Sequence, residues 1–257
     1  MSKEAHGTEK RVSDAERDRI FAEQRALIQD FNFGSATAAV FDDMLVRSVP
    51  FYIETQRMMG ELVSDFAVPG TNIYDLGCST GTTFLNLDNY LPRDESFNFV
   101  GVDNSQAMLD KAALRLKEHG FNRPTELRVA DLNTGVEISD ASVVILNLTL
   151  QFVRPLNRNA IVANIYRGLR PGGCLILVEK VLGEHSIFNR LFIKHYYEFK
   201  ARNGYSELEI AQKREALENV LIPYHFTENF DMLRREGFQE MDVFFKWYNF
   251  CGMIAVK

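Results

Sequence analysis

The sequence predicts an α/β fold: one domain with a mostly parallel sheet, closed by an antiparallel hairpin at its C-terminal end. First, short apolar runs alternate with stretches of helical spacing, which predicts parallel strands joined by right-handed crossovers. Second, two aromatic, β-rich runs at 238–246 and 248–256 are joined by too few residues for a helix. Third, 257 residues that are 46% hydrophobic and 25% charged are enough for one sizeable core.

An N-terminal extension is expected over residues 1–30, before the domain at 31–257. The start of the extension is polar and charged, and is expected to be disordered. Further on, the spacing that begins with Ile20 and Phe21 predicts a helix over 14–29.

The first half of the domain is expected to alternate between helices and parallel strands. Pro50 favours a turn or a helix start, and each short apolar strand is followed by a helical stretch or a turn. The expected elements are helix 52–66, strand 72–76, a helix from 82, strand 99–103, helix 106–118, and strands 126–130 and 142–148.

The second half begins with a helix over 159–169, expected to stop at the Arg-Pro-Gly-Gly turn 170–173. An almost wholly apolar strand follows over 174–179. The pattern then becomes helical, so a helical insertion is expected at about 183–223, ahead of the hairpin. The helices expected after the strand span 187–199, 206–221 and 227–235.

The most informative stretch is the turn after strand 72–76, which reads Asp75-Leu76-Gly77-Cys78-Ser79-Thr80-Gly81. Its glycines allow a tight turn and the close approach of a ligand to the backbone at a helix N-terminus. Ser79 stands where a dinucleotide-binding turn has its middle glycine, which makes room for a pyrophosphate. The pattern therefore favours a nucleoside ligand without a pyrophosphate, the alternative being an ordinary turn.

Asp103 ends the next apolar strand, roughly twenty residues beyond Gly81, a spacing at which a carboxylate can hydrogen-bond ribose hydroxyls. Each motif is weak alone, but they occur in the expected order. Two strand-end acids, Asp75 and Asp103, without a pyrophosphate turn indicate S-adenosylmethionine as the ligand.

Composition excludes several other functions. The formal net charge of −6 disfavours direct binding of a nucleic acid, which needs clustered Lys and Arg. Cys78, Cys174 and Cys251 have the spacing of neither a disulfide framework nor a zinc site, and suit a reducing cytoplasm. No apolar run approaches the roughly twenty residues of a membrane span, and no signal peptide is visible. We therefore expect a cytoplasmic protein with no metal and no membrane contact.

From about residue 32 to 257 the chain resembles the carboxy-S-adenosyl-L-methionine synthase family. Generic methyltransferases share the glycine turn, whereas the insertion block Asn203-Gly204-Tyr205-Ser206-Glu207-Leu208-Glu209-Ile210 and its continuation to 220 are specific. Departures are the charged N-terminus, Thr80 in place of a more apolar residue, and the stretch 181–197. The other matching blocks are Arg47-Ser48-Val49-Pro50, residues 74–79, Asp103-Asn104-Ser105 and residues 146–152.

The resemblance implies a Rossmann-like S-adenosylmethionine-dependent methyltransferase fold, with the ligand across the carboxyl ends of the strands. Asp103 is expected to bind the ribose hydroxyls, and Asp131 and the Leu132 amide to bind adenine. Asp131 in an ordinary polar loop, and Asn147 as a satisfied strand-end amide, are the alternatives. The cofactor-binding residues that the resemblance implies are Tyr52, Gly77, Cys78, Ser79, Asp103, Asn104, Asp131, Leu132, Asn147 and Arg214.

Arg214 is the candidate catalytic residue. A guanidinium near a sulfonium is useful only when the substrate or product carries carboxylates, which it can bind bidentately. Without the resemblance, spacing alone favours an exposed helix charge. Arg202 and Tyr205 are weaker candidates for the acceptor pocket, and the cluster at 195–197 has the spacing of ordinary core and surface residues.

The activity implied by the resemblance transfers no methyl group. Prephenate loses a carboxyl group and is dehydrated to phenylpyruvate, while the methyl on sulfur becomes a carboxymethyl group. The positive sulfur makes the methyl protons acidic, so confinement and orientation are expected to do most of the work, without a protein nucleophile. The resemblance also implies a homodimer and delivery of the product to a separate transferase that modifies the tRNA wobble uridine.

Two alternatives remain open at this point. One is a small-molecule methyltransferase that uses the same cleft and releases S-adenosylhomocysteine. The other is a non-catalytic, cofactor-binding partner of a tRNA-modifying enzyme, which would bind the cofactor without turnover.

Overall fold

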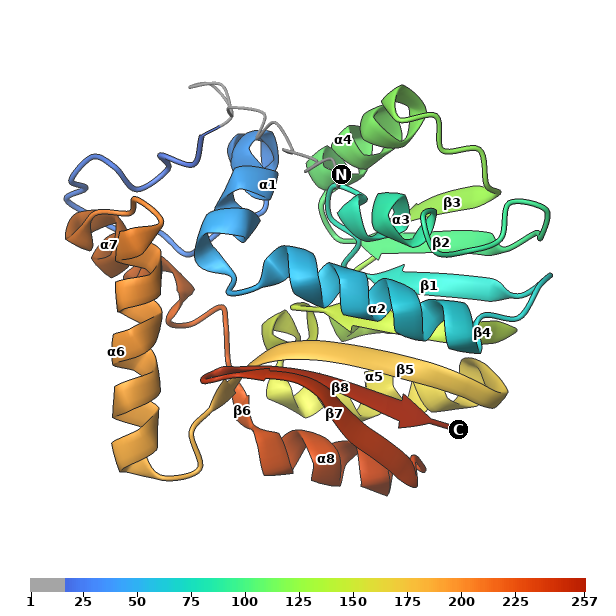
Figure 1. Ribbon diagram of the computed structural model, residues 1–257. Helices are drawn as coiled ribbons and strands as arrows, with labels where there is room; N and C mark the ends of the chain where they lie inside the picture. Colours follow the sequence, from blue (N-terminus) through green and yellow to red (C-terminus); the bar gives the residue numbers. More distant parts are fainter. Residues whose placement is uncertain (1–16) are drawn as a thin grey trace, which may run out of the picture.

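The computed structural model describes residues 17–257, built around one mixed sheet (Figure 1). The sheet has the order β3-β2-β1-β4-β5-β8-β7, with the short β6 paired beside β5. Pairing is parallel from β3 to β5 and antiparallel from β5 through β8 to β7, which confirms the predicted fold class. The strands are β1 Asn72–Leu76, β2 Asn98–Asp103, β3 Thr125–Val129, β4 Ala141–Asn147, β5 Leu169–Leu182, β6 Tyr224–His225, β7 Glu240–Trp247 and β8 Phe250–Val256.

Helices cover both faces of the sheet, and a further group lies beyond the carboxyl ends of the parallel strands. In Figure 1, α1, α6 and α7 occupy that end of the molecule. The α-helices are α1 Ser35–Ser48, α2 Tyr52–Phe66, α3 Thr82–Leu87, α4 Gln106–Glu118, α5 Pro155–Gly168, α6 Ser186–Arg202, α7 Glu207–Leu217 and α8 Phe226–Arg235, with short 3-10 turns η1 Leu132–Thr134 and η2 Leu150–Phe152.

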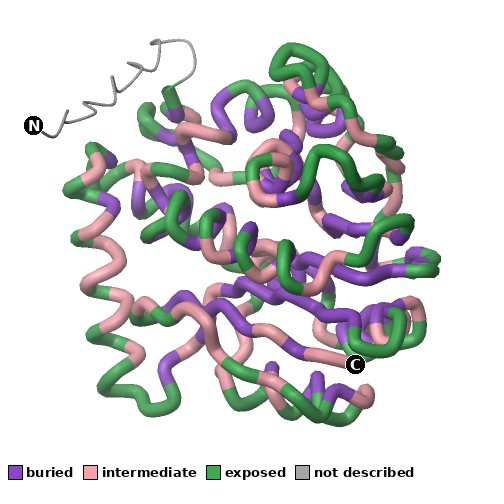
Figure 2. Tube along the Cα trace, turned by 45° about the vertical axis from the view of Figure 1, so that its right-hand side comes forward, coloured by how far each residue is buried: buried purple, intermediate pink, exposed green. Residues whose placement is uncertain are grey.

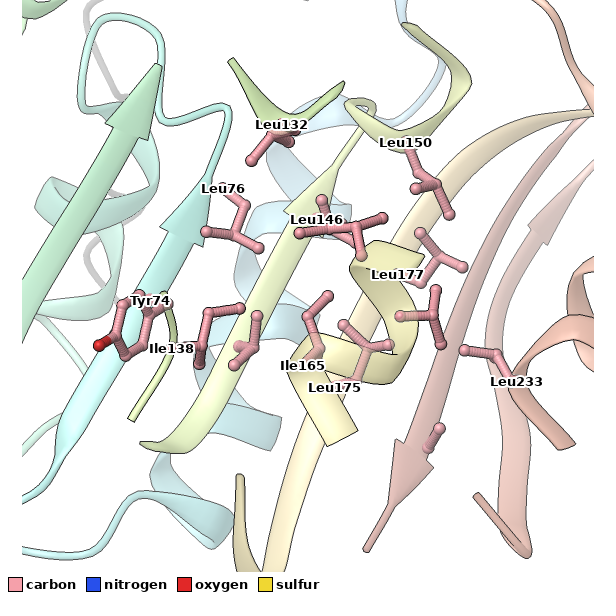
Figure 3. Packing of buried hydrophobic residues seen from close by; sticks show 14 of the residues in the cluster. Tyr74, Leu76, Leu132, Ile138, Leu146, Leu150, Ile165, Leu175, Leu177 and Leu233 are labelled. Carbon is pink, nitrogen blue, oxygen red and sulfur yellow. The ribbon is translucent and has the colours of Figure 1, made fainter. Parts of the chain in front are cut away.

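The central strands are buried on both faces, so the side chains of successive residues pack in two separate cores. On β1, Ile73 packs with α2 and α3, whereas Tyr74 and Leu76 pack on the side of α5 and α8. Figure 3 shows the core on the side of α5 and α8, where Leu76, Leu146 and Leu177 from three strands pack against side chains of these two helices. Figure 2 shows how burial varies along the chain: the central strands are buried and the loops are exposed. These cores fix the strand ends relative to one another.

The predicted N-terminal helix is wrong over its described part, because residues 17–34 contain no helix. Residues 14–16, and the predicted disorder at the start, lie outside the described residues. The segment is held by the Gln212 side chain, whose Nε2 donates to the carbonyls of Phe21 and Glu23 at 2.9 and 2.8 Å, and whose Oε1 accepts from the Arg25 amide at 2.8 Å. Tertiary hydrogen bonds thus replace the bonds within a helix.

Two other elements differ from expectation. Helix α1 was not predicted, although Ala38, Phe41 and Met44 recur at helical spacing and pack against Met108 of α4. The predicted turn 170–173 lies inside β5, as an irregularity where the pairing with β4 passes from Leu169 directly to Cys174. Within residues 17–257, no helix is both long and apolar enough to cross a membrane.

Candidate functional site

A cavity of about 350 Å³ lies at the carboxyl ends of β1, β2 and β4. The N-terminal segment contributes Phe31 and Phe33 to its wall, and α6 and α7 contribute charged and aromatic side chains. The structure brings all the sequence-predicted site residues together in this one cavity, and their binding of a cofactor stays a prediction. They are Tyr52, Gly77, Cys78, Ser79, Asp103, Asn104, Asp131, Leu132, Asn147 and Arg214.

The glycine turn is held in an unusual backbone conformation. Gly77 has a φ of +87°, and a Cβ there would lie 2.3 Å from the hydroxyl oxygen of Thr149. The amides of Gly77 and Cys78 donate to the carbonyl of Val102 at 2.7 and 3.0 Å, so they are already used by the fold. This pairing agrees with a ligand that has no pyrophosphate for the turn to hold.

Asp103 is tied into the turn and stays available to a ligand. Its Oδ2 accepts from the Ser79 amide and its Oδ1 from the Ser105 amide, both at 2.9 Å. The carboxyl is 8% exposed, and burial raises its pKa, partly offset by these bonds. Since a carboxylate has about four acceptor positions, Asp103 keeps acceptor capacity for a hydroxyl of a ribose.

Asp75 and Cys78 are both buried at the glycine turn, and of the two only Cys78 lines the cavity. Asp75 precedes the turn and is 1% exposed, and burial raises its pKa to about 7, with the Thr83 side chain opposing the shift. Burial also raises the pKa of the Cys78 thiol, which therefore stays protonated. Among residues 17–257, no group of three or more His, Cys, Asp or Glu is placed to hold a metal ion.

On the β3 side of the cavity, Asp131 precedes the turn η1. Its Oδ1 accepts from the backbone amide and the side chain of Asn133, both at 2.9 Å, so the residue does cap a polar loop. Its second oxygen, Oδ2, makes no hydrogen bond within residues 17–257. Capping and ligand binding by Asp131 are thus compatible, and both Asp131 and Leu132 line the cavity.

A polar network anchors the turn to the helices around it. The hydroxyls of Thr80 and Thr82 donate to Asp42 Oδ1 of α1 at 3.0 and 2.9 Å, and Arg115 of α4 donates to the same oxygen at 2.9 Å. Thr80, which departs from the expected apolar residue, is therefore a linking group. It holds α1, a wall of the cavity, against the start of α3.

Four cationic side chains line the cavity on the side of β5, α6 and α7. Arg214 was predicted from the sequence, and it is exposed overall while contributing to the cavity wall. Sequence reasoning missed Lys180, Lys200 and Lys213, because an ordinary lysine at a strand end or in a helix is a solvated charge. Their burial, which the sequence does not show, is the distinguishing signal.

Of the aromatic residues near these cations, some line the cavity and others do not. Tyr196 and Tyr197 line the cavity, although their spacing gave no reason to choose them. His195 does not line it and instead contacts Glu198 at 3.1 Å. Tyr205 lies behind the wall with its hydroxyl donating to Asp18 at 2.6 Å, and Arg202 is likewise absent from the wall.

Comparisons with known proteins agree with this geometry. A family model described as a methyltransferase domain matches residues 73–173. The carboxy-S-adenosyl-L-methionine synthase of Methylococcus capsulatus is 59% identical over 94% of this chain and 99% of its own, and that of Desulfotalea psychrophila is 44% identical over 89% and 93%. A solved S-adenosyl-L-methionine-dependent methyltransferase of Methanococcus maripaludis, described as putative, shares the fold with a TM-score of 0.59 at 15% identity, over 89% of this chain and 95% of that one.

Proposed function

The chain belongs to the carboxy-S-adenosyl-L-methionine synthase family, and we propose that it converts S-adenosyl-L-methionine and prephenate to carboxy-S-adenosyl-L-methionine and phenylpyruvate. The family and the methyltransferase-like fold make S-adenosyl-L-methionine a reactant. Prephenate as the second substrate is part of the proposal.

One observation carries the proposal: the glycine turn and Asp103 share a single cavity with several cationic side chains. A methyltransferase would gain nothing from cations near the sulfonium, because like charges repel. An enzyme whose product bears a carboxylate next to sulfur needs a cation there. We assign that role to Arg214, whose planar guanidinium can hold a carboxylate with two hydrogen bonds.

The proposed reaction balances without any further reactant. The bond between the prephenate ring and its carboxylate breaks to release carbon dioxide, and the electron pair aromatises the ring and expels the hydroxyl group. The departing hydroxide takes a proton from the sulfonium methyl group and becomes water. The methyl carbon then bonds to carbon dioxide and becomes a carboxymethyl group. The protein's share is to align both reactants and exclude bulk water.

The test is the identity of the product. Purified protein given both substrates is expected to form carboxy-S-adenosyl-L-methionine and phenylpyruvate, identified by mass spectrometry. Protein purified without added cofactor is also expected to release a nucleoside heavier than S-adenosyl-L-methionine by one carboxyl substitution. Formation of S-adenosylhomocysteine with a methylated acceptor would support the methyltransferase alternative, and cofactor binding without turnover would support the partner alternative.

The protein is further proposed to act as a homodimer. Helix α6 carries the exposed apolar side chains Ile187, Phe188 and Leu191, and Tyr248 packs on Phe192 of the same helix, which supports a surface that a second copy covers. Its product would pass to a separate tRNA-modifying transferase. The net charge of −6 supports a role that ends with a diffusible product and involves no direct hold on RNA.

A further inference from the structure

Three of the four cations in the cavity, Lys180, Lys200 and Arg214, make no ion pair within residues 17–257, and of these three Arg214 is exposed. Lys180 lies near the end of β5, and Lys200 lies on α6 and is 5% exposed. Within residues 17–257 neither ammonium has a hydrogen bond or an ion pair. Lys213 differs, because its ammonium lies 3.5 Å from the buried carboxylate of Asp18. The N-terminal segment therefore gives one lysine of the cluster an ion pair and leaves the other two lysines without one.

Both unpaired ammoniums are positioned by one aromatic ring. The Lys200 ammonium lies 4.7 Å and the Lys180 ammonium 5.1 Å from the centroid of the Tyr196 ring. The ring itself is fixed, because the Tyr196 hydroxyl donates to the Ser48 carbonyl at 3.0 Å and its edge packs on Phe250. Cation–π contact with a fixed ring stabilises the two side chains modestly and holds their ammoniums in the cavity wall.

A modest contact does not offset the cost of burying two like charges. Burial, with the neighbouring charges of Lys213, Lys180 and Arg214, lowers the pKa of Lys200 to about 7 even though Asp18 nearby opposes the shift, and burial lowers the pKa of Lys180 to about 8. Burying an ammonium without a partner costs free energy, and an anionic ligand that pairs with the ammonium offsets this cost. The arrangement therefore calls for a ligand that brings negative charge.

The position of the pair separates it from the nucleoside end of the cavity. Asp103 and Asp131 follow β2 and β3, whereas Lys180 lies on β5, on the other side of β1 and β4 in the sheet order. S-adenosyl-L-methionine has one carboxylate and a positive sulfonium. It therefore cannot neutralise the charges of both lysines and of Arg214 together. A second reactant with two carboxylates can.

We propose that Lys180 and Lys200, held against the ring of Tyr196, form the subsite that binds the carboxylates of a dicarboxylate second substrate. The identity of that substrate as prephenate rests on the proposed function above. Lys180 and Lys200 are then specificity-determining residues, because phenylpyruvate has one carboxylate and leaves one ammonium uncompensated, which favours its release after turnover.

The experiment measures the two ligands separately. The variants are Lys180→Met, Lys200→Met and Lys200→Arg, and the matched control is Lys194→Met, an exposed lysine of the same helix. Calorimetry gives the affinity of each protein for S-adenosylhomocysteine, and then the affinity of the saturated protein for prephenate, so that binding is read without turnover. Steady-state kinetics give KM for prephenate.

Each methionine variant is expected to weaken prephenate binding and raise its KM by at least about tenfold, as the loss of one partner of a buried charge pair does. Affinity for S-adenosylhomocysteine should stay within about twofold, Lys200→Arg should recover part of the loss, and the control should match the parent. Unchanged prephenate affinity would overturn the proposal, as would a loss confined to S-adenosylhomocysteine, which would assign the lysines to the methionine carboxylate.

Failure of the proposed function has a different signature. If the parent forms no carboxylated product but binds prephenate more tightly than phenylpyruvate through Lys180 and Lys200, the subsite stands and the reaction assigned to it is wrong. If the parent binds neither acid in the saturated state, the subsite proposal fails as well.

Discussion

The hydroxyl of Tyr205 on the insertion donates a 2.6 Å hydrogen bond to Oδ2 of Asp18 in the N-terminal segment. Asp18 is 2% exposed, and the same oxygen lies 3.5 Å from the Lys213 ammonium. This contact joins two parts of the chain that are far apart in sequence and places Phe31 and Phe33 over the cavity. The N-terminal segment is therefore a structural part of the site.

Replacing Asp18 with asparagine should destabilise the fold by about 3 kcal/mol, because Lys213 is then buried without its counter-charge. The measurement is the free energy of unfolding in urea. Glu23→Gln, an exposed carboxylate of the same segment, serves as the control and should change little. Equal stability of the Asp18 variant and the parent would mean that the contact does not hold the segment.

Asp103→Ala should cost about 2 to 4 kcal/mol of cofactor binding, because it removes the acceptor for both ribose hydroxyls and leaves the donors unpaired. Calorimetric titration with S-adenosyl-L-methionine checks this value. Asp110→Ala, an exposed acid on α4, is the matched control. Parental affinity in the Asp103 variant would remove Asp103 from the cofactor site.

Arg214→Ala should abolish the preference for carboxy-S-adenosyl-L-methionine over S-adenosyl-L-methionine while sparing affinity for the latter. The loss of a bidentate pair with the added carboxylate should cost about 2 to 5 kcal/mol, against almost nothing for an exposed helix charge. Arg214→Lys should recover only part of this preference, since a lysine ammonium lacks the planar fork of the guanidinium. Arg234→Ala, an exposed arginine paired with Asp231, is the control. Synthesis at the parental rate by Arg214→Ala would refute this role.

Lys200→Met should stabilise the ligand-free protein by about 1 to 4 kcal/mol near neutral pH, because it removes a buried charge without a partner. The folded-state pKa of Lys200 is about 7, below the ordinary value of 10.5, so the unfolded chain binds more protons between these values. The parent therefore gains stability as pH rises through this window, and the advantage of the variant shrinks.

Urea unfolding of parent and variant at pH 7 and pH 9 tests this sign. The charged and titratable groups that face Lys200 are Lys180 on β5, Tyr196 and Tyr197 on α6, Lys213 and Arg214 on α7, and Asp18 in the N-terminal segment. An advantage that grows with pH would contradict the assignment of the slope to Lys200.

Bare tRNA should bind only weakly, because a chain with a net charge of −6 and no basic run lacks the gain from counterion release. Filter binding or fluorescence anisotropy at several salt concentrations measures this affinity. A submicromolar, strongly salt-dependent affinity would revive a direct role on tRNA.

The sequence by itself determined the elements whose signals are local. Helix 52–66, strand 72–76 and helix 106–118 were predicted with the bounds that the structure has, because their apolar periodicity and flanking turns lie within a few residues. The nucleoside half of the site followed too, since parallel strands end at one edge of the sheet and so bring 77–79, 103 and 131 together.

Tertiary structure alone decided the second half of the site. Lys180 and Lys200 lie on different elements, and only packing reveals that both are partly or fully buried, contact one ring and make no ion pair within residues 17–257. The residues that surround a lysine in the sequence do not show whether its side chain is solvated or buried, so no local signal separates these two lysines from Lys194. The path of residues 17–34 was decided in the same way, because Gln212 and Tyr205, distant in sequence, supply the hydrogen bonds that a local helix would have made for itself.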